Sequence, residues 1–246
     1  MINGKMIVVV LPAYNAEKTI KLTVNEIDRE IVDKIILMDD NSSDQTINIG
    51  LELDLIIYKH NVNLGYGGNQ KSCYAIALSE GADIIIMVHP DYQYTPKLIP
   101  VMAWMLAHDL YDVVLASRIL GGKALQGGMP IYKYVANRFL TFIENILTGM
   151  KLSEFHTGFR IYGKQFNRMP FEKFSDDYLL SFEVIAFAAF MNFKSAEVPV
   201  ECDYIDDHTS HSYIGASIYA IQHFLTLFRF LLTKVRIKSG IFRSLR

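Results

Sequence analysis

The chain has 246 residues, of which 51% are hydrophobic, 12% aromatic and 20% charged. These proportions are those of an ordinary globular protein, and they exclude a disordered, collagenous or coiled-coil chain. The length fits one large α/β domain, or such a domain with a short appendage. The two cysteines, Cys73 and Cys202, provide neither a disulfide framework nor the spacing of a zinc site, which favours a reducing, cytoplasmic compartment.

The formal net charge of −2 hides an uneven distribution of charge. Six of the 24 basic residues and no acidic residue fall within positions 229–246, so the first 228 residues carry 18 basic and 26 acidic side chains. A basic end of this kind favours an anionic surface as a partner. We expect a protein that is peripheral on the inner face of a membrane, with no nucleic-acid partner. Residues 1–5 lack the pattern of a signal peptide, so we expect no export.

Short apolar runs alternate with helical segments along the first 200 residues. Six runs are typical of buried strands: Met6–Leu11, Lys34–Met38, Asp54–Tyr58, Asp83–Val88, Asp112–Ala116 and Glu197–Val200. Helices are expected over about 16–30, from the glycine-rich turn at 65–68 to 80, over 132–147, and from a cap at 175–177 to 189. This alternation predicts an α/β fold with a mainly parallel sheet, whose ligands bind at the carboxyl ends of the strands.

The C-terminal segment is predicted to be a separate amphipathic unit. Polar residues near 204–212 mark a boundary, which divides the chain into a domain over 1–205 and a helical segment over 206–246. Apolar residues recur there at helical spacing: Ile214, Ile218, Ile221, Leu225, Phe228, Leu232 and Val235. The segment is too polar to span a bilayer and is expected to lie on one. The alternatives are a helix packed on the core or at a homodimer interface.

A candidate metal site follows the fourth predicted strand. His89, Asp91 and Gln93 occupy alternate positions, so an extended turn would point all three side chains to one side. Imidazole, carboxylate and amide together suit Mn²⁺ better than Ca²⁺. The alternative is an ordinary solvated loop.

Other charged residues lie where chemistry is expected. Asp39 and Asp40 end the second strand, where a carboxylate can bind a nucleoside or can cap the next helix. Arg118 and Arg160 could clamp phosphates, or could pair with acidic residues at the surface. Glu183 lies in an apolar stretch, where a buried carboxylate needs a partner or a purpose.

Several of these segments together resemble a known family. They are Val10-Leu11-Pro12-Ala13-Tyr14-Asn15-Ala16-Glu17, Met38-Asp39-Asp40-Asn41-Ser42-Ser43-Asp44-Gln45-Thr46, Asn63-Leu64-Gly65-Tyr66-Gly67 and Ser117-Arg118. In this order they resemble the family 2 glycosyltransferases of GT-A fold. Thr157-Gly158-Phe159-Arg160 and Glu183 narrow the resemblance to proteins similar to dolichyl-phosphate mannose synthase and bacterial polyprenyl-phosphate glycosyltransferases.

The resemblance implies roles for individual residues. Residues matching the nucleotide-sugar site are Pro12, Ala13, Tyr14, Asn15, Glu17, Asp39, Asp40, Gly65, Asp91 and Arg160. Asp91 and Gln93 match metal ligands for Mn²⁺ or Mg²⁺, whereas His89 stands where the family has an aspartate. Residues expected at the reacting groups are Asp91, Arg118, Asp177 and Glu183. Residues 204–213 lack the family's usual basic residues, and His208, His211 or a lysine of the C-terminal segment could replace them.

The resemblance also implies an inverting transfer of a sugar from a UDP- or GDP-sugar, assisted by a divalent cation, to a polyprenyl or dolichyl phosphate. An ionised lipid phosphate needs cationic positioning, for which Arg118 is the candidate, rather than a general base. One alternative is transfer to a saccharide hydroxyl, which needs a carboxylate base such as Asp177 or Glu183. The other is a catalytically silent nucleotide-binding protein.

Overall fold

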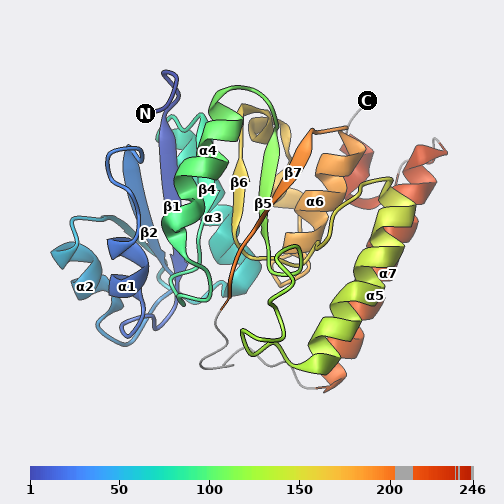
Figure 1. Ribbon diagram of the computed structural model, residues 1–246, viewed down its shortest axis with the longest axis horizontal. Helices are drawn as coiled ribbons and strands as arrows, with labels where there is room; N and C mark the ends of the chain where they lie inside the picture. Colours follow the sequence, from blue (N-terminus) through green and yellow to red (C-terminus); the bar gives the residue numbers. More distant parts are fainter. Residues whose placement is uncertain (203–212, 236, 238, 245–246) are drawn as a thin grey trace.

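The computed structural model describes residues 1–202, 213–235, 237 and 239–244. The predicted boundary at 204–212, with His208 and His211, lies outside the described residues. Within them, seven strands form one sheet in the order β3-β2-β1-β4-β6-β5-β7 (Figure 1). The strands are β1 (Ile7–Ala13), β2 (Lys34–Asp39), β3 (Ile56–Lys59), β4 (Ile84–Met87), β5 (Val113–Ser117), β6 (Arg160–Tyr162) and β7 (Ser195–Pro199).

The sheet is mainly parallel, as the sequence predicts, with one exception. β6 pairs antiparallel with both β4 and β5, and every other pairing is parallel. The sequence analysis does not predict β6, because three residues are too few to show a strand pattern. The first residue of β6, Arg160, lies opposite Met87 of β4 and Leu115 of β5. The start of β6 therefore meets the carboxyl ends of its two neighbours.

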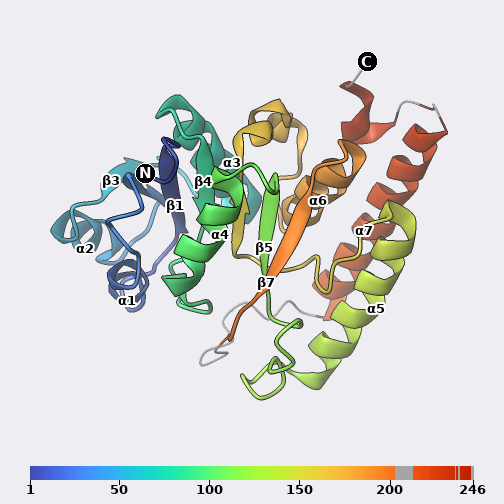
Figure 2. The same ribbon diagram turned by 45° about the horizontal axis from the view of Figure 1, so that its top comes forward.

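Helices cover both faces of the sheet (Figure 2). They are α1 (Ile20–Asn25), α2 (Thr46–Glu52), α3 (Gly65–Ser79), α4 (Ile99–Ala107), α5 (Ile131–Thr148), α6 (Leu180–Phe190) and α7 (Tyr213–Lys234). Side chains of α1 and α4 share one core with the sheet, and side chains of α3, α6 and α7 share the other. The helix predicted over 16–30 is much shorter in the structure, and α4 lies where the sequence analysis predicts no element.

The alternation of side chains along each strand divides the apolar residues between the two cores. On β1, Ile7, Val9 and Leu11 enter the core with α1 and α4, whereas Val8 and Val10 enter the core with α3. All five side chains are fully buried. A strand covered by helices on both faces must be apolar at every position, which explains the continuous apolar runs in the sequence.

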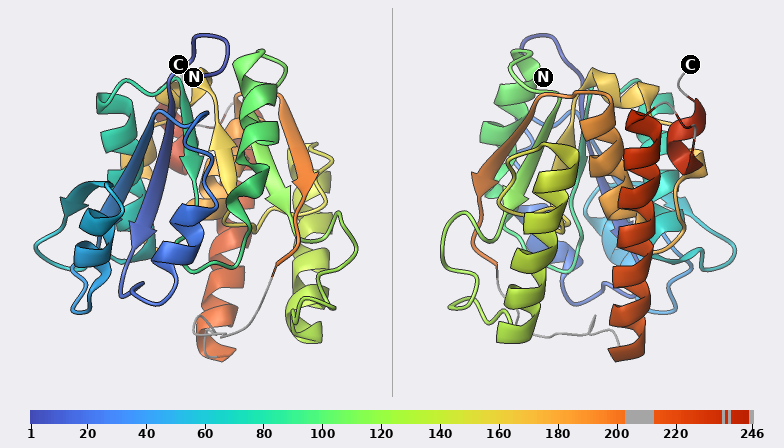
Figure 3. Two further views of the ribbon diagram at one scale, coloured as in Figure 1. Left: turned by 60° about the vertical axis from the view of Figure 1, so that its left-hand side comes forward. Right: turned by 90° about the vertical axis from the view of Figure 1, so that its right-hand side faces the viewer.

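The last long helix, α7, lies beside α5 (Figure 3). It also contacts α6 and the short 3-10 helix over Gly240–Ser244. Leu227, Phe230 and Phe242 are buried in the core shared with α3 and α6. One face of the C-terminal segment is thus packed on the domain. No helix among the described residues is long and apolar enough to cross a bilayer.

The helix α5 has the reverse of the usual amphipathic pattern. Its buried positions are all polar: Asn137, Thr141, Glu144 and Thr148. Its exposed side chains include six large hydrophobic ones, each 59–73% exposed: Ile131, Tyr132, Val135, Phe139, Phe142 and Ile146. A helix of a water-soluble domain normally turns its apolar face inward. The polar face of α5 meets the protein, and its apolar face is left for another partner.

Candidate active site

The predicted site residues gather at one edge of the sheet. The parallel strands β1, β2, β4 and β5 all end there, and β6 begins there. The segments that follow or precede these ends contain Tyr14, Asp40, Asp91, Arg118 and Arg160. Ligand sites of open α/β sheets lie at this edge. The topology thus brings these segments to the same edge of the sheet, and their roles in binding stay predictions.

Hydrogen bonds join the loop after β1 to the loop after β2. The backbone N–H groups of Asn15, Ala16 and Glu17 donate to Ser42 Oγ, Thr46 Oγ1 and Asp44 Oδ2 at 2.7–3.1 Å. In the other direction, Asn15 Oδ1 accepts from the backbone of Ser43, and Glu17 Oε2 accepts from that of Gln45. Asn15 has a φ of 51°, a conformation that asparagine tolerates better than most residues. The side chains of Asn15 and Glu17 thus hold the two loops together.

The two hydrogen-bonded loops leave one large side chain facing solvent. Tyr14 is 57% exposed, between the buried Ala13 and Ala16. An exposed aromatic ring on a rigid loop is suited to stacking on a planar ligand group. Tyr14 is one of the exposed residues among those that the resemblance places at the nucleotide.

Asp39 and Asp40 are both buried, but their surroundings differ. Asp40 accepts hydrogen bonds from the backbone of Leu64 and Gly65 at 2.8 and 3.0 Å, and its Oδ1 lies 2.8 Å from His60 Nδ1. Asp39 Oδ2 accepts from the backbone of Ser42 at 3.0 Å, while its Oδ1 is buried without a hydrogen-bond partner among the described residues. Asp40 therefore ties β2 to the start of α3. A ligand contact of Asp39 stays a prediction.

The structure separates the three predicted metal ligands by their surroundings. Asp91 is exposed, and its Oδ1 accepts from the backbone of Gln93 at 3.1 Å in a tight turn. The His89 ring stacks on Tyr66 at 5.3 Å, with Nε2 3.4 Å from the Tyr66 hydroxyl. Burial lowers the pKa of His89, against the opposing effect of Asp91, and the positive charge of Arg160 lowers it further. His89 is therefore favoured in its neutral form, which is the form that ligates metals.

The predicted phosphate-binding Arg118 has an acidic partner inside the protein. Its Nε donates to Glu154 Oε1 at 2.8 Å, its terminal Nη2 also contacts that oxygen, and its backbone N–H donates to Oε2 at 2.9 Å. Glu154 is fully buried and also accepts from Asn137 of α5 at 2.9 Å. Burial alone would raise the pKa of Glu154, but Arg118 holds it below its ordinary value. The ion pair fixes the guanidinium at the end of β5.

Arg160 is committed to the protein backbone in this structure. It is 2% exposed, and its guanidinium donates to the carbonyl oxygens of Thr157, Phe155 and Ser181. These bonds join the segment before β6 to α6. A contact between Arg160 and the donor diphosphate stays a prediction. In the structure the guanidinium is hydrogen-bonded to backbone carbonyl oxygens of the protein instead.

Two further predicted residues, Asp177 and Glu183, lie at the N-terminal end of α6. Glu183 is 4% exposed and accepts from the backbone of Ser175 at 2.6 Å, and burial raises its pKa. Asp177 Oδ1 accepts from the backbone of Leu179 at 2.8 Å, so it caps the turn before the helix. Asp177 is exposed and Glu183 is not. If either acts as a base, the geometry favours Asp177.

The glycines in the first turn of α3 allow this helix to approach the segment before α6. The backbone N–H groups of Gly67 and Gly68 donate to the carbonyl oxygen of Asp176 at 2.9 and 3.2 Å. A Cβ atom on Gly67 would lie 2.5 Å from the carbonyl carbon of Asp176. Gly65, with a φ of 78°, opens the helix and donates to Asp40. Gly67 in particular is thus required for close packing of the start of α3 against the backbone around Asp176.

The sequence analysis does not identify the polar network beneath Arg118. Glu154, Glu144 and His223 are fully buried, and His156 is largely so. One signal was available in the sequence. Polar residues of α5 at positions 137, 141, 144 and 148 recur at helical spacing among apolar neighbours, which is typical of a face turned toward polar partners.

The family model described as glycosyl transferase family 2 matches residues 8–169, about two thirds of the chain. The chain belongs to glycosyl transferase family 2. It is a glycosyltransferase, and its match to the family covers the loops after β1, β2, β4 and β5.

Relatives support the same conclusion. The UDP-N-acetylglucosamine–dolichyl-phosphate N-acetylglucosaminyltransferase of Methanococcus voltae is 30% identical over 220 residues, covering 82% of this chain and 87% of that protein. An uncharacterized protein of Methanocaldococcus jannaschii is 29% identical over 235 residues, covering 95% and 94%. The two alignments extend well beyond the residues that the family model matches.

Solved structures identify the fold as GT-A-like. Glucosyl-3-phosphoglycerate synthase from Mycobacterium tuberculosis superposes with a TM-score of 0.70 at 19% identity, covering 93% of this chain and 80% of that one. Another structure of that enzyme, with a TM-score of 0.68, 18% identity and coverage of 95% and 81%, contains Mn²⁺, UDP-glucose and phosphoglyceric acid. The predicted fold class is confirmed.

Proposed function

We propose that this glycosyltransferase moves a sugar from a nucleotide-sugar to a polyprenyl phosphate such as dolichyl phosphate, at a membrane surface. The relative from Methanococcus voltae, as named, acts on dolichyl phosphate. The observation that carries the proposal is the reversed amphipathicity of α5, whose polar face supports Arg118 while its apolar face is exposed.

The donor is proposed to bind over the loops after β1 and β2. The exposed ring of Tyr14 can stack on a nucleobase, and the buried Oδ1 of Asp39 can accept a hydrogen bond from it. Asp40 is already engaged by three donor groups, so in this arrangement it positions Asp39 and the start of α3. Uridine and guanosine both offer a ring N–H to such an acceptor.

A divalent cation fits the residues after β4. Asp91 can offer its second carboxylate oxygen, and Gln93 an amide oxygen, so they would hold Mn²⁺ or Mg²⁺, with His89 as a neutral neighbour. When bound, the cation neutralises the charge that develops on the leaving diphosphate. The protein's own part is to keep Asp91 accessible in a fixed turn at the edge of the sheet.

The acceptor is proposed to approach along α5 and α7. The outer faces of these two adjacent helices carry large apolar side chains, including Phe139 and Phe142 on α5 and Ile221 and Phe228 on α7. Together with Val235, directly after α7, these side chains are 58–67% exposed. Ile221, Phe228 and Val235 belong to the predicted apolar stripe, and the side chains of Ile214 and Ile218 lie outside the described residues. An apolar face this extensive marks a contact with lipid or protein. Exposed Arg229 and Lys234 flank it and suit anionic headgroups.

The reaction at the site is proposed to be a single displacement with inversion. A lipid phosphate is largely ionised near neutral pH, so its oxygen can attack the anomeric carbon without a general base. Its negative charge needs a fixed cation, and Arg118 is held in place by Glu154 and lies above the ring of Tyr94 at 6.0 Å. Arg118 would align the acceptor phosphate opposite the leaving diphosphate.

The test supplies the protein with radiolabelled UDP- and GDP-sugars, Mn²⁺ and either a polyprenyl phosphate or the matching polyprenol. Label that passes into the organic phase only with the phosphate supports the proposal. Label that stays in water on an added saccharide would show the hydroxyl-directed alternative, with Asp177 as its base. Absence of transfer and of donor hydrolysis with every donor would refute catalysis and favour a silent binding protein.

Substitutions can distinguish the proposed donor side of the site, at Asp91, from the proposed acceptor side, at Arg118. Asp91→Ala should abolish the Mn²⁺-dependent part of donor binding, whereas Asp109→Ala, an exposed aspartate on the opposite edge, should leave it unchanged. Arg118→Lys keeps the positive charge but loses the planar fork, so turnover should fall by at least tenfold while donor affinity stays within twofold. Equal losses in both would place Arg118 at the donor.

A further inference from the structure

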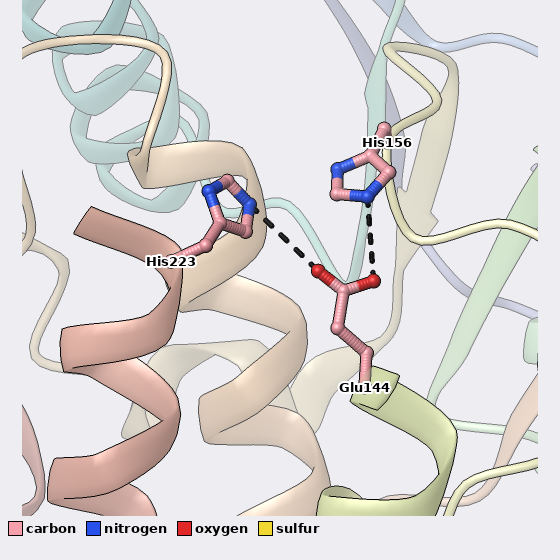
Figure 4. A group of neighbouring side chains, drawn as sticks. All are labelled: Glu144, His156 and His223. Carbon is pink, nitrogen blue, oxygen red and sulfur yellow. Dashed lines mark ion pairs between the residues drawn. The ribbon is translucent and has the colours of Figure 1, made fainter. Parts of the chain in front are cut away.

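A second cluster of potential metal ligands lies under the α5–α7 pair. Glu144 of α5, His156 of the segment before β6 and His223 of α7 point toward one another (Figure 4). Glu144 Oε2 lies 3.3 Å from His156 Nε2, and Glu144 Oε1 lies 3.8 Å from His223 Nε2. One ligand atom from each residue falls within 4.8 Å of the other two. The cluster joins three segments that are distant in the sequence.

The surroundings of Glu144 indicate that a partner is needed at the centre of the cluster. The residue is 0% exposed, and neither carboxylate oxygen has a hydrogen bond of acceptable geometry with the described residues. A carboxylate taken out of water is costly unless it is hydrogen-bonded or coordinates a metal. The contrast with Asp40 is direct, because Asp40 has two backbone donors and His60 at 2.8 Å.

The distances also fit ligands around one ion. Two atoms bonded to the same tetrahedral zinc at about 2.0–2.2 Å lie about 3.3–3.5 Å apart. Glu144 Oε2 and His156 Nε2 already have this spacing, and Glu144 Oε1 and His223 Nε2 lie a few tenths of an ångström further apart. The ligand atoms of the two histidines lie within 4.8 Å of each other, so the three side chains would close in around a bound ion. The two histidine rings are held by packing, since the His223 ring lies against Phe182 at 4.4 Å and against His156 at 5.2 Å.

The donor set selects the kind of metal. Two imidazoles and one carboxylate are ligands for zinc and other late first-row cations, whereas Mg²⁺ and Ca²⁺ prefer oxygen. The site therefore differs in chemistry from the turn at Asp91 and Gln93, which offers oxygen atoms at the exposed edge of the sheet. A cation held by Glu144, His156 and His223 would be buried, and it would be separate from the cation at the donor.

We propose that Glu144, His156 and His223 form a binding site for one transition-metal cation of the zinc class. Its role is to position the acceptor side of the molecule. The carbonyl oxygen of His156 accepts from Arg118 Nη2 at 3.1 Å, and Glu144 and His223 belong to the two helices with the exposed apolar faces. A cation at this point would lock α5 and α7 to the segment that holds Arg118.

Metal binding can be measured without any enzymatic assay. Chelator-treated full-length protein is titrated with Co²⁺, whose visible absorption reports nitrogen and oxygen coordination, and then with Zn²⁺ as competitor. We expect one Co²⁺ per chain, displaced by Zn²⁺. Glu144→Gln and His223→Gln should each weaken binding at least tenfold, while His108→Gln, an exposed histidine on α4's C-terminal side, and Asp91→Ala should not.

Three results would overturn the proposal. The first is a folded wild-type protein that takes up no Co²⁺ or Zn²⁺ at micromolar concentrations. The second is uptake that Asp91→Ala abolishes and His223→Gln leaves unchanged, which would place the ion at the donor site. The third is an X-ray absorption spectrum at the zinc edge of the wild-type protein that shows one imidazole ligand or none, where the proposed site requires two. This measurement does not depend on the folding of the variants.

Discussion

The ion pair between Arg118 and Glu154 gives the sharpest test of how the site is held together. Glu154→Gln removes the negative charge but keeps the size of a side chain that is 0% exposed. The Arg118 side chain, 12% exposed, then loses the negative charge that its Nε and Nη2 atoms contact. Breaking a buried pair in this way costs about 3–5 kcal/mol of unfolding free energy. For a chain of this length the melting temperature should fall by roughly 6–20 °C.

A double-mutant cycle tests the cause of that loss. Arg118→Met combined with Glu154→Gln removes both charges, so the double variant should recover most of the stability that the single variant loses. The measurement is urea unfolding followed by circular dichroism, with the four proteins compared at pH 7. Additive effects of the two single changes, or a loss below about 1 kcal/mol for Glu154→Gln, would refute the reasoning.

The same pair predicts a dependence on pH. Because Arg118 holds the pKa of Glu154 below its ordinary value of 4.5, the folded carboxyl binds a proton less readily than the unfolded one. The pair therefore contributes stability above pH 4.5, and the contribution is lost as the pH falls through the folded-state pKa. The difference in unfolding free energy between wild type and Glu154→Gln should shrink in that acidic range. A difference that does not change with pH would contradict the ion-pair account.

Three further predictions concern other parts of the site. Gly67→Ala should destabilise the protein by about 1–3 kcal/mol in urea unfolding, because its Cβ would lie 2.5 Å from backbone, whereas Gly121→Ala, whose nearest contact is 3.5 Å, should stay within about 0.5 kcal/mol. Phe142→Glu should reduce the fraction of protein that floats with anionic phosphatidylglycerol vesicles several-fold. Val101→Glu on α4, a residue of similar exposure, should not reduce it. Equal effects of the two substitutions would refute membrane contact through α5. Burial raises the pKa of Glu183. The unfolding free energy of the wild type should therefore fall, relative to that of Glu183→Gln, as the pH rises from 4.5 through the folded-state pKa. The opposite slope would show that the carboxylate is stabilised in its charged form.

The strands were predictable because their burial leaves a strong pattern. A central parallel strand needs apolar residues at every position, so Ile7–Ala13 and Ile84–Met87 stand out in the sequence. The antiparallel β6 left no such signal, since its three residues become a strand only through pairing with β4 and β5. The helix predicted over 16–30 was too long, because α1 ends at Asn25.

The predicted site residues met at one edge of the sheet for a topological reason, but their bonding could not be anticipated. Arg118 and Arg160 looked equivalent as isolated cations in the sequence. In the structure the first pairs with the buried carboxylate of Glu154, and the second donates to three backbone carbonyls. Glu154 lies 36 residues from Arg118, and the Ser181 carbonyl lies 21 residues from Arg160, so spacing along the chain does not reveal either contact.

The sequence by itself determined the α/β class, the edge of the sheet at which chemistry occurs and the amphipathic character of the last helix, because periodicity and strand ends are local properties. Tertiary structure decided which face of each helix is turned inward. On α5 it turned the polar residues toward the protein and left Phe139 and Phe142 outside, and it brought Glu144 and His156 together with His223 from a helix more than 60 residues further along the chain. Such contacts follow from how helices pack on a completed sheet, so only the folded chain reveals them.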